Sequence, residues 1–510
     1  MSLDGVSGDS PFLRQLESFV PGVLSGRRLE AGGRTLGSLS EGLAGYVPPP
    51  TIQKRDDLIE LAVGKSGALL GAGEARALEG ALAESFTALT ANHHAINTLP
   101  EFIQGILIFA LRQLAGDRRR AGGAIAVFSA GGVPMSDLTF PGGILLGRPK
   151  RDDSTTGVRL RLFKPKARKT LVNRHPGFSA ADVAKARAQV PGGQWRGYEQ
   201  AALADIVDHF LNDPQVLALK PFSQQCTVIN AKLWPRMFRP GLPVPPLVML
   251  DKLELERDLL LADLRNENSL AYALLFDPGL RDIIARCMNG DRACWTCRSL
   301  DDGSAPTRGS LFFWGIDREG RMFPLSLDQD KGRLFSARYP AFTLELTPGA
   351  VERALRENSI LPGLYLGFTA MALARGLMCC GGIFQTGYLR RIRNGTAAGL
   401  AAAGYGGMAA RLKALTDAPL TSGMLPLGFV NGLDPPYAAG GVELLAAGGL
   451  SAGQLAALRD MTLSRALASS FPYLYELAVP SGERLPGWQE SLRSEYGVEL
   501  FPAGQAAPGK

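Results

Sequence analysis

Two of the four histidines in this chain are adjacent and follow an asparagine, in the segment Asn92-His93-His94. Histidine is the usual general base near neutral pH, and a neighbouring amide can orient its ring or stabilise an oxyanion. We therefore predict that Asn92, His93 and His94 form a catalytic centre, with either histidine as the base. The alternative is a histidine pair that only satisfies the buried ends of two helices.

Three of the six cysteines lie close together along the chain and include a Cys-x-x-Cys pair. Cys287, Cys294 and Cys297 fall within eleven residues. A structural zinc ion needs four ligands, and no second Cys-x-x-Cys or spaced histidine pair completes this set. The sequence therefore predicts no metal centre, with a metal or redox role kept as an alternative to purely structural cysteines.

A second pair of cysteines, Cys379 and Cys380, precedes Gly381-Gly382 and Gln385. Either thiol is a candidate nucleophile if a nearby histidine stabilises its thiolate. Glycines at this point allow close approach of a ligand, and Gln385 is a candidate substrate-binding residue. Free cysteines are also common residues of hydrophobic cores, which is the competing interpretation.

Ten basic residues occur between Arg148 and Arg174. Arg159 and Arg161 alternate with apolar residues, so they are expected on one face of a half-buried strand. Two arginines so placed can hold a phosphate or carboxylate, and we predict that they bind an acidic group of the substrate. A solvated charged face is the alternative. Nucleic acid is not an expected partner, because Phe163 is the only aromatic residue in the stretch.

Two helices are expected to position the histidines. Glu74 to Thr90 has apolar residues at helical spacing, and Thr98-Leu99-Pro100-Glu101 resembles a capping box that opens a helix running to about Leu114. Asn92-His93-His94 would then lie on a helix–helix loop, beside a helix N-terminus with spare N–H groups. Gln104, further along that helix, is predicted to contact the substrate.

The remaining elements mix strands and helices without regular β–α–β alternation. This pattern favours an α+β fold with mixed sheets and helix-rich N- and C-terminal parts. We predict three regions: an irregular arm (1–54), a main body that carries the site (55–395) and an Ala/Gly/Leu-rich helical part (396–510).

Composition is that of a globular protein, with 46% hydrophobic and 20% charged residues in 510. The first residues lack the pattern of a secretory signal, and the most apolar segments are too short or too interrupted to span a bilayer. Six cysteines are few for this length, which is typical of a reducing compartment. We expect a soluble, cytoplasmic protein.

The histidine segment resembles two acyltransferase motifs. The pair is similar to the His-His-x-x-x-Asp motif of condensation-type acyltransferases, and Asn92-His93 to the Asn-His-x-x-x-x-Asp motif of glycerolipid acyltransferases. Both motifs require an aspartate where this chain has Thr98. The glycerolipid family also has a later Phe-Pro-Glu-Gly, for which Phe140-Pro141-Gly142-Gly143 lacks the glutamate. The sequence is therefore assigned to neither family.

Together these patterns predict an enzyme, acyltransferase-like, that acts on a small anionic organic substrate by histidine acid–base or acyl-transfer chemistry. The main alternative is a non-catalytic binding or assembly protein whose basic face docks on an acidic partner. A nucleic-acid binder and a zinc enzyme are more distant alternatives. The sequence indicates neither a cofactor nor an oligomeric state.

Overall fold

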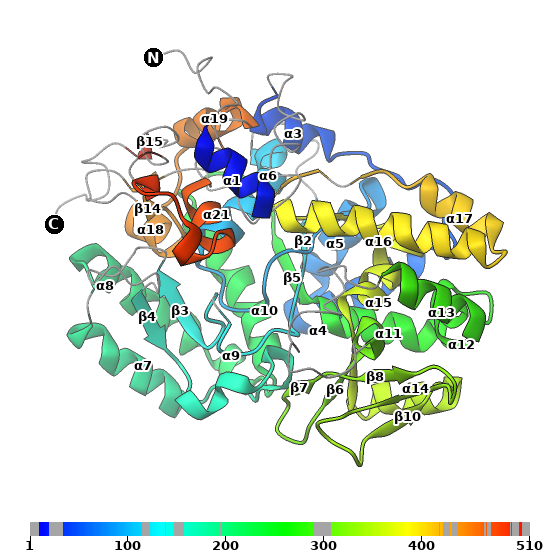
Figure 1. Ribbon diagram of the computed structural model, residues 1–510. Helices are drawn as coiled ribbons and strands as arrows, with labels where there is room; N and C mark the ends of the chain where they lie inside the picture. The colour runs from blue at the N-terminus through cyan, green and yellow to red at the C-terminus, as the bar shows by residue number, and fades with distance from the viewer. Residues whose placement is uncertain are drawn as a thin grey trace.

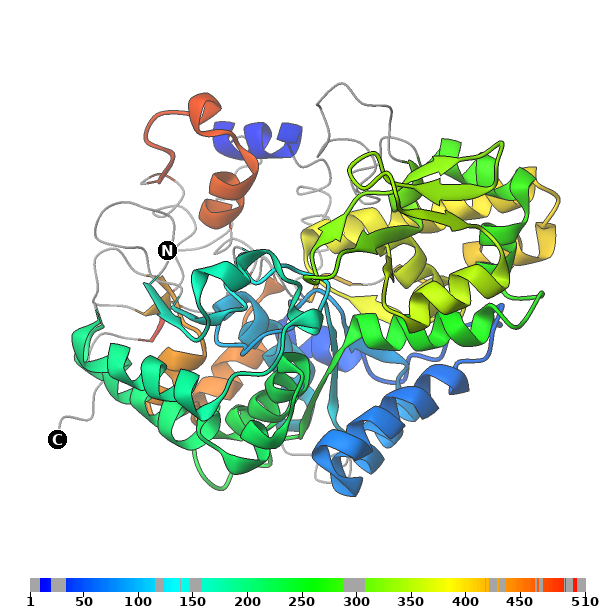
Figure 2. The ribbon, with the colours of Figure 1, turned by 90° about the horizontal axis from the view of Figure 1, so that it is seen from below.

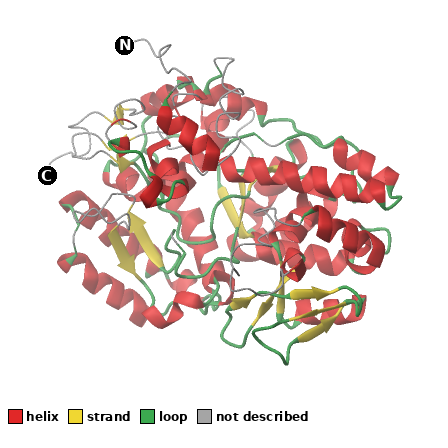
Figure 3. Ribbon diagram, in the orientation of Figure 1, coloured by secondary structure: helices red, strands yellow, loops and turns green. Residues whose placement is uncertain are grey.

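The computed structural model describes residues 10–19, 34–114, 123–137, 139–146, 158–193, 195–288, 308–417, 419–421, 429–430, 437–463, 466, 471–489, 491 and 499–501. Helices dominate, and the strands fall into several small sheets (Figures 1 and 3). The sheets include both parallel and antiparallel pairs, which confirms the expected α+β fold.

A four-stranded parallel sheet lies in the middle of the molecule. Its strands, in spatial order, are β12 (Met378–Cys380), β1 (Thr87–Leu89), β2 (Ile125–Ser129) and β5 (Leu247–Asp251). Because every pairing is parallel, all four strands end at the same edge of the sheet. In open parallel sheets this carboxyl edge is where ligands bind, so the residues that follow each strand are of first interest.

Alternate residues of these strands enter two different hydrophobic cores, as the period of two along a strand requires. Leu89 and Val127 lie in the first core, whereas Ala88 and Phe128 lie in the second. Both faces of the sheet are thus covered, which explains why the strands read as continuous apolar runs.

The first core is formed mainly by helices between β1 and β5 and by both ends of the chain. The crossover from β1 to β2 is α6. The helices and the hairpin strands on this side are α1 (Pro11–Phe19), α3 (Leu36–Gly42), α6 (Pro100–Leu114), β3 (Gly143–Leu146), β4 (Val158–Arg161), η2 (Pro165–Lys169), η3 (Val172–Arg174), α7 (Ala180–Gly192), α8 (Gly197–Asp205), η4 (Ile206–Leu211), α9 (Pro214–Ala218), α10 (Phe222–Leu233), η5 (Trp234–Met237), α18 (Gly441–Ala446), α19 (Ala452–Asp460) and α21 (Phe471–Ala478).

The second core packs under two small antiparallel sheets, seen together in the view from below (Figure 2). Its elements are α4 (Asp56–Leu70), α5 (Ala72–Glu84), α11 (Lys252–Asp263), α12 (Leu270–Phe276), α13 (Pro278–Cys287), η7 (Arg308–Leu311), β6 (Phe313–Ile316), β7 (Met322–Phe323), β8 (Ser326–Asp328), β9 (Arg333–Phe335), β10 (Thr343–Glu345), α14 (Pro348–Arg356), β11 (Ile360–Pro362), α15 (Leu364–Phe368), η8 (Thr369–Leu373), α16 (Ile383–Ala402) and α17 (Gly406–Lys413). Apart from these, β13 (Phe429–Val430), β14 (Tyr437–Ala438) and β15 (Glu499–Phe501) pair together, and η9 spans Ser481–Glu483.

The structure differs from the sequence prediction at the entry to the candidate site. The helix expected over Glu74–Thr90 ends at Glu84, and β1 follows it. The residues of β1 kept the helical spacing by chance, but they pair with β12 and β2 instead. Asn92-His93-His94 therefore follows a strand, not a helix, and lies at the carboxyl edge of the central sheet.

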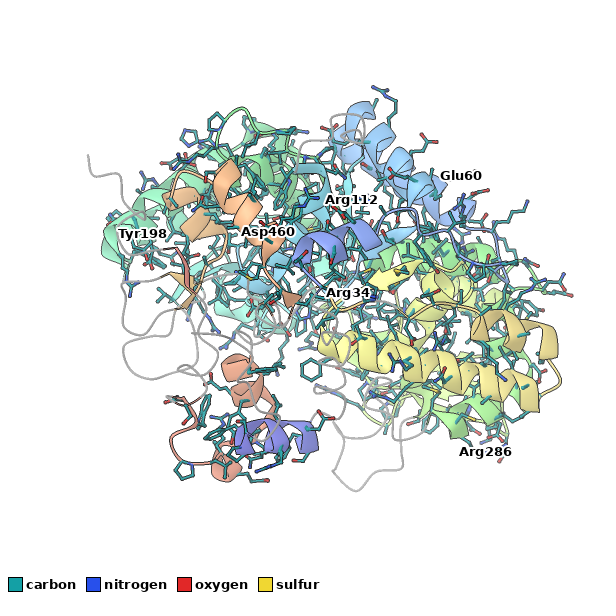
Figure 4. The ribbon with its side chains drawn as sticks, turned by 90° about the horizontal axis from the view of Figure 1, so that it is seen from above. Arg34, Glu60, Arg112, Tyr198, Arg286 and Asp460 are labelled. Carbon is teal, nitrogen blue, oxygen red and sulfur yellow. The ribbon has the colours of Figure 1, made fainter. Side chains whose placement is uncertain are left out.

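Both ends of the chain join the first core. Leu36 N–H donates to the Met461 carbonyl (2.8 Å), and Leu463 N–H donates to Arg34 O (2.9 Å), so α3 is fixed to the segment after α19. In the view from above (Figure 4), Arg34, Arg112 and Asp460 lie near one another, where α3, α6 and α19 meet. The boundary expected at 395/396 falls inside α16.

Among the helices that the structure describes, none has both the length and the apolar composition needed to cross a bilayer.

Candidate active site

His93 forms a histidine–aspartate pair at the carboxyl edge of the central sheet. Its Nδ1 lies 3.0 Å from Asp137 Oδ1 and 3.0 Å from Thr139 Oγ1. The backbone around it is an extension of the β1–β2 ladder: Ala130 N–H donates to Asn92 O, and His94 N–H donates to Ala130 O. The ring thus projects from a fixed backbone. Its side chain is 30% exposed, and no described residue bonds to Nε2.

Asp137 follows β2, and its loop is ordered by local hydrogen bonds. The N–H and the hydroxyl of Thr139 both donate to Asp137 Oδ1, at 3.0 and 2.8 Å. Burial alone would raise the pKa of Asp137, but the hydrogen bonds and charge of His93 and the bonds from Thr139 outweigh it and lower the pKa to about 2. The carboxylate is therefore ionised at neutral pH and can hold the proton on Nδ1, which leaves Nε2 as the basic nitrogen.

His94 is in a different environment from its neighbour. It is fully buried, with Nε2 donating to the Ser223 carbonyl (2.7 Å) and Nδ1 2.6 Å from Ser129 Oγ. Burial lowers its pKa, against the opposing effect of the Ser223 hydrogen bond. A neutral ring with both nitrogens occupied joins β1, β2 and α10. Of the two histidines predicted as the base, the structure leaves His93 accessible.

Asn92 is fully buried, and neither amide atom has a hydrogen-bond partner among the described residues. Unsatisfied buried amides are rare in proteins, and each calls for an explanation such as a bound water, an ion or a functional role. Its backbone carbonyl accepts from Ala130, so the orphaned amide is held in place by the sheet.

The Cys379–Gln385 segment lies beside the histidine segment, because β12 pairs with β1. Leu89 is opposite Cys380, and Gln385 Nε2 donates to Thr90 Oγ1 (2.6 Å). Gln385 Oε1 is buried without a partner. Two segments 295 residues apart in sequence thus end at the same sheet edge.

Both thiols of that segment are protonated in the folded protein. Burial raises the pKa of Cys379 to about 12, and burial followed by the charge of Cys379 raises that of Cys380 further. Both side chains are at most 2% exposed. A buried neutral thiol is a poor nucleophile, so the geometry does not favour Cys379 or Cys380 for that role.

A small apolar cluster lies between His93 and Arg159 and contacts both side chains. The His93 ring lies 5.8 Å from the ring of Phe102, which packs with Leu145 and Phe140. The Arg159 guanidinium lies over the Phe140 ring, at 4.8 Å from its centroid. Phe140 has a left-handed backbone (φ 53°), which is costly for an aromatic residue and is typical of functional sites.

The arginines near this cluster repel one another. Burial lowers the pKa of Arg159, and so do the charges of Arg161 and Arg168. Arg168 is close to the pair's loop, since its carbonyl accepts from Ser136 N–H (2.9 Å). Arg159 Nε is buried without a hydrogen-bond partner among the described residues, whereas Arg161 is exposed. Arg159 therefore provides a partly buried positive charge that suits an anion.

Gln104, which the sequence predicted to contact the substrate, is buried on α6 and bonds to another part of the chain. Its Nε2 donates to the carbonyl of Ala439 (2.7 Å), which attaches α6 to the segment before α18. The helix α6 begins at Pro100, so Leu99 and not Thr98 directly precedes it, and the Thr98 hydroxyl donates to Leu145 O. Glu101, in the first turn of α6, has a buried, unpartnered Oε2, and burial raises its pKa to about 7.

Two acidic residues on the carboxyl side of the central sheet were missed from the sequence. Asp137 lies in the Gly- and Pro-rich loop after β2, and Asp251 is the last residue of β5. The Asp251 carboxylate lies so close to Gly131 that a Cβ there would be 2.3 Å from its oxygens, so only glycine fits. For Asp251, an acidic residue at the end of a buried apolar run was the available signal, whereas Asp137 lies eight residues beyond β2 and had none.

The described residues contain no group of three or more His, Cys, Asp or Glu side chains placed to hold a metal ion. Cys287 is exposed at the end of α13, and Cys294 and Cys297 lie outside the described residues.

We compared the chain with known proteins, and no family model, curated protein or solved structure matches it.

Proposed function

We propose that this protein is an enzyme that acts on a small anionic organic substrate, with His93 as the general base. The observation that carries this proposal is the 3.0 Å contact between His93 Nδ1 and Asp137 Oδ1, in a pair that is partly exposed at the carboxyl edge of a parallel sheet. An ionised aspartate on Nδ1 fixes the tautomer and stabilises the imidazolium that forms when Nε2 takes a proton.

Acyl transfer is the reaction class we favour. His93 Nε2 would remove the proton of an acceptor hydroxyl or thiol, whose oxygen or sulfur attacks the acyl carbon. The leaving group would then depart with that proton, returned by the imidazolium. The acyltransferase-like motifs in the sequence lack their aspartate at Thr98, and Asp137 supplies a carboxylate from the loop after β2.

Arg159 would bind the anionic group of the substrate. It is partly buried, faces repulsion from Arg161 and Arg168, and lies on the same apolar cluster as His93 through Phe140 and Phe102. A carboxylate or phosphate would relieve that repulsion. The four described free cysteines, among them the adjacent Cys379 and Cys380, support a reducing and hence cytoplasmic location.

The test is a panel of p-nitrophenyl esters and acyl thioesters, each in a carboxylated and a neutral form. We expect turnover of carboxylated members, and His93→Ala should lower kcat/KM at least about 100-fold. Asp137→Asn should also lower kcat, and Arg159→Ala should raise KM for the carboxylated members alone.

His209 provides a matched control, because it also pairs with an aspartate. Its Nδ1 lies 2.9 Å from Asp205 Oδ1, but the pair is on an exposed helix surface. His209→Gln should leave kcat/KM unchanged. Absence of turnover across the panel, or full activity in both His93→Ala and Asp137→Asn, would overturn the proposal.

The mutual repulsion of Arg159, Arg161 and Arg168 also supports a second candidate, a basic face that docks on an acidic partner protein. It predicts that a polyglutamate-coated resin no longer captures the double variant Arg161→Glu, Arg168→Glu, whereas it still captures His93→Ala. Retention of the double arginine variant on the resin, equal to that of His93→Ala, would exclude this candidate.

A further inference from the structure

A cavity of about 130 Å³ lies where β5 ends, between α4, α10 and the start of α11. Its volume is roughly four times the share of one water molecule in liquid water. Ala68, Leu69 and Leu250 form an apolar wall, and neither His93 nor Asp137 lines it. The cavity is therefore distinct from the proposed catalytic pair.

Two buried polar atoms among the residues that line this cavity have no hydrogen-bond partner among the described residues. They are Asp251 Oδ2 and Ser223 Oγ, on side chains that are 6% and 2% exposed. The other oxygen of Asp251 accepts from Leu253 N–H at the start of α11 (3.0 Å), so the carboxyl group is held in one orientation. An unpartnered carboxyl oxygen and an unpartnered hydroxyl, on two residues that line one cavity, call for a hydrogen-bond donor.

The charges around the cavity specify a positive donor. Lys65 is already engaged, with Nζ 2.8 Å from Asp258 Oδ2 and 3.5 Å from Glu254 Oε2. Burial, followed by repulsion from the Glu254 carboxylate, raises the pKa of Asp251 to about 7, against the opposing effects of backbone hydrogen bonds from Leu253 and Gly131 and of the charge of Arg174. A small cation placed between these two carboxyl groups would offset their repulsion and donate to the free oxygens.

We propose that this cavity is a binding site for a small primary alkylammonium ion. The ammonium group donates to Asp251 Oδ2 and Ser223 Oγ, and a short alkyl chain lies against Ala68, Leu69 and Leu250. The three N–H bonds of an ammonium group match this arrangement of acceptors, and the apolar wall distinguishes an alkylammonium from an inorganic cation.

Binding should depend on pH through Asp251. The other titratable groups that face Asp251 are Lys65, Arg174, Cys226, Glu254 and Glu256, and His94 faces Glu254. Since the ammonium ion binds the ionised carboxylate, affinity should be about tenfold higher at pH 8 than at pH 6.

Isothermal titration of the full chain with propylammonium chloride tests the proposal. We expect a Kd tighter than about 1 mM at pH 8. Asp251→Asn, which keeps the cap on α11, should weaken binding at least about tenfold and remove its pH dependence. Ala68→Leu, which fills the cavity without changing charge, should also prevent binding. Sodium chloride, 1-propanol and propionate should give no competing signal.

Asp277 supplies the matched control. It caps α13 as Asp251 caps α11, through Leu280 N–H, and does not line the cavity, so Asp277→Asn should leave the affinity unchanged. Equal binding by wild type, Asp251→Asn and Ala68→Leu would overturn the proposal, as would equal affinity for 1-propanol or no binding at all. Since these readouts need no substrate turnover, they are independent of the proposed function. Circular dichroism of each variant identifies any failure to fold, and Ser223→Ala then replaces that variant.

Discussion

Two adjacent histidines differ here because their ring nitrogens meet different partners. His94 has both nitrogens engaged in the interior, whereas His93 has an aspartate on one nitrogen and partial exposure. Residue type alone could not separate them, since both lie on one segment. Their partners, Ser223 and Asp137, lie far along the chain, and only tertiary structure brings them within hydrogen-bond distance.

His94→Ala should destabilise the protein by about 2–4 kcal/mol at neutral pH. The substitution leaves a cavity and removes the donor to the buried Ser223 carbonyl. Urea unfolding followed by circular dichroism measures the loss. His209→Gln, at a side chain that is 70% exposed, should change stability by less than about 0.5 kcal/mol. A wild-type stability in His94→Ala would contradict the structural role.

His94 should also make the fold sensitive to acid. Its pKa is lowered in the folded state, so the unfolded chain binds more protons below the unfolded value of about 6.5. The contribution of neutral His94 to the unfolding free energy is therefore complete above that pH and is lost as the pH falls. His175, whose pKa burial also lowers, acts in the same direction. In His94→Gln the decline of the unfolding free energy below about pH 6.5 should be shallower than in wild type; an equal slope would contradict this.

At the scale of elements, the sequence predicts well where local signals dominate. Residue types that commonly cap helices or open turns do so here, in the Ser179–Asp182 capping box, the Thr347 cap and the turn at Asp317. The short strands β1 and β12 were hidden, because three apolar or small residues inside longer runs fit a helix equally well. Their parallel pairing depends on partners hundreds of residues away, which no local pattern records.

For the same reason the candidate site was predicted only in part. Asn92, His93 and the Cys379–Gln385 segment were identified by residue type, and they do lie at one sheet edge. The carboxylates of Asp137 and Asp251 were missed, because only the arrangement of β2 and β5 in the folded sheet places them on its carboxyl side.

A buried ion pair holds three elements of the second core together. The Arg375 guanidinium, fully buried, contacts Asp263 of α11 at 2.6 Å and Asp57 of α4 at 3.2 Å. Arg375→Met should cost about 3–5 kcal/mol of unfolding free energy, because the Asp263 carboxylate is left buried without a counter-charge. Urea denaturation at neutral pH measures this loss.

Arg265 is the matched control, since it contacts Glu352 at the same 2.6 Å but is 63% exposed. Arg265→Met should cost less than about 1 kcal/mol. The double variant Arg375→Met, Asp263→Leu should recover part of the loss, because no charge remains unpaired. Equal costs for the two single arginine variants would show that burial is not decisive here.

At the scale of the whole molecule, the C-terminal helices complete a core that begins near the N-terminus. Val442, Leu458 and Tyr475 belong to the same cluster as Leu36 and residues of α6. A chain ending at residue 435 should therefore expose this cluster, bind a hydrophobic dye and unfold without a cooperative transition. Dye fluorescence and thermal unfolding are the measurements.

A chain ending at residue 501 is the control, because it keeps every described element. It should unfold like the full chain. If the chain ending at 435 also unfolds cooperatively, the helices after that point form a separable unit and the shared core is not required for folding.

The pairing of β1 with β12 has a consequence for synthesis of the protein. Thr90 donates to Cys380 across 290 residues of sequence, so one side of the candidate site leaves the ribosome long before the other. At typical elongation rates the delay is roughly 15 to 60 s. During that interval β1 presents an open edge, and a nascent chain carrying Asn92 and His93 has an incomplete site. The candidate site is therefore completed only after β12 has left the ribosome.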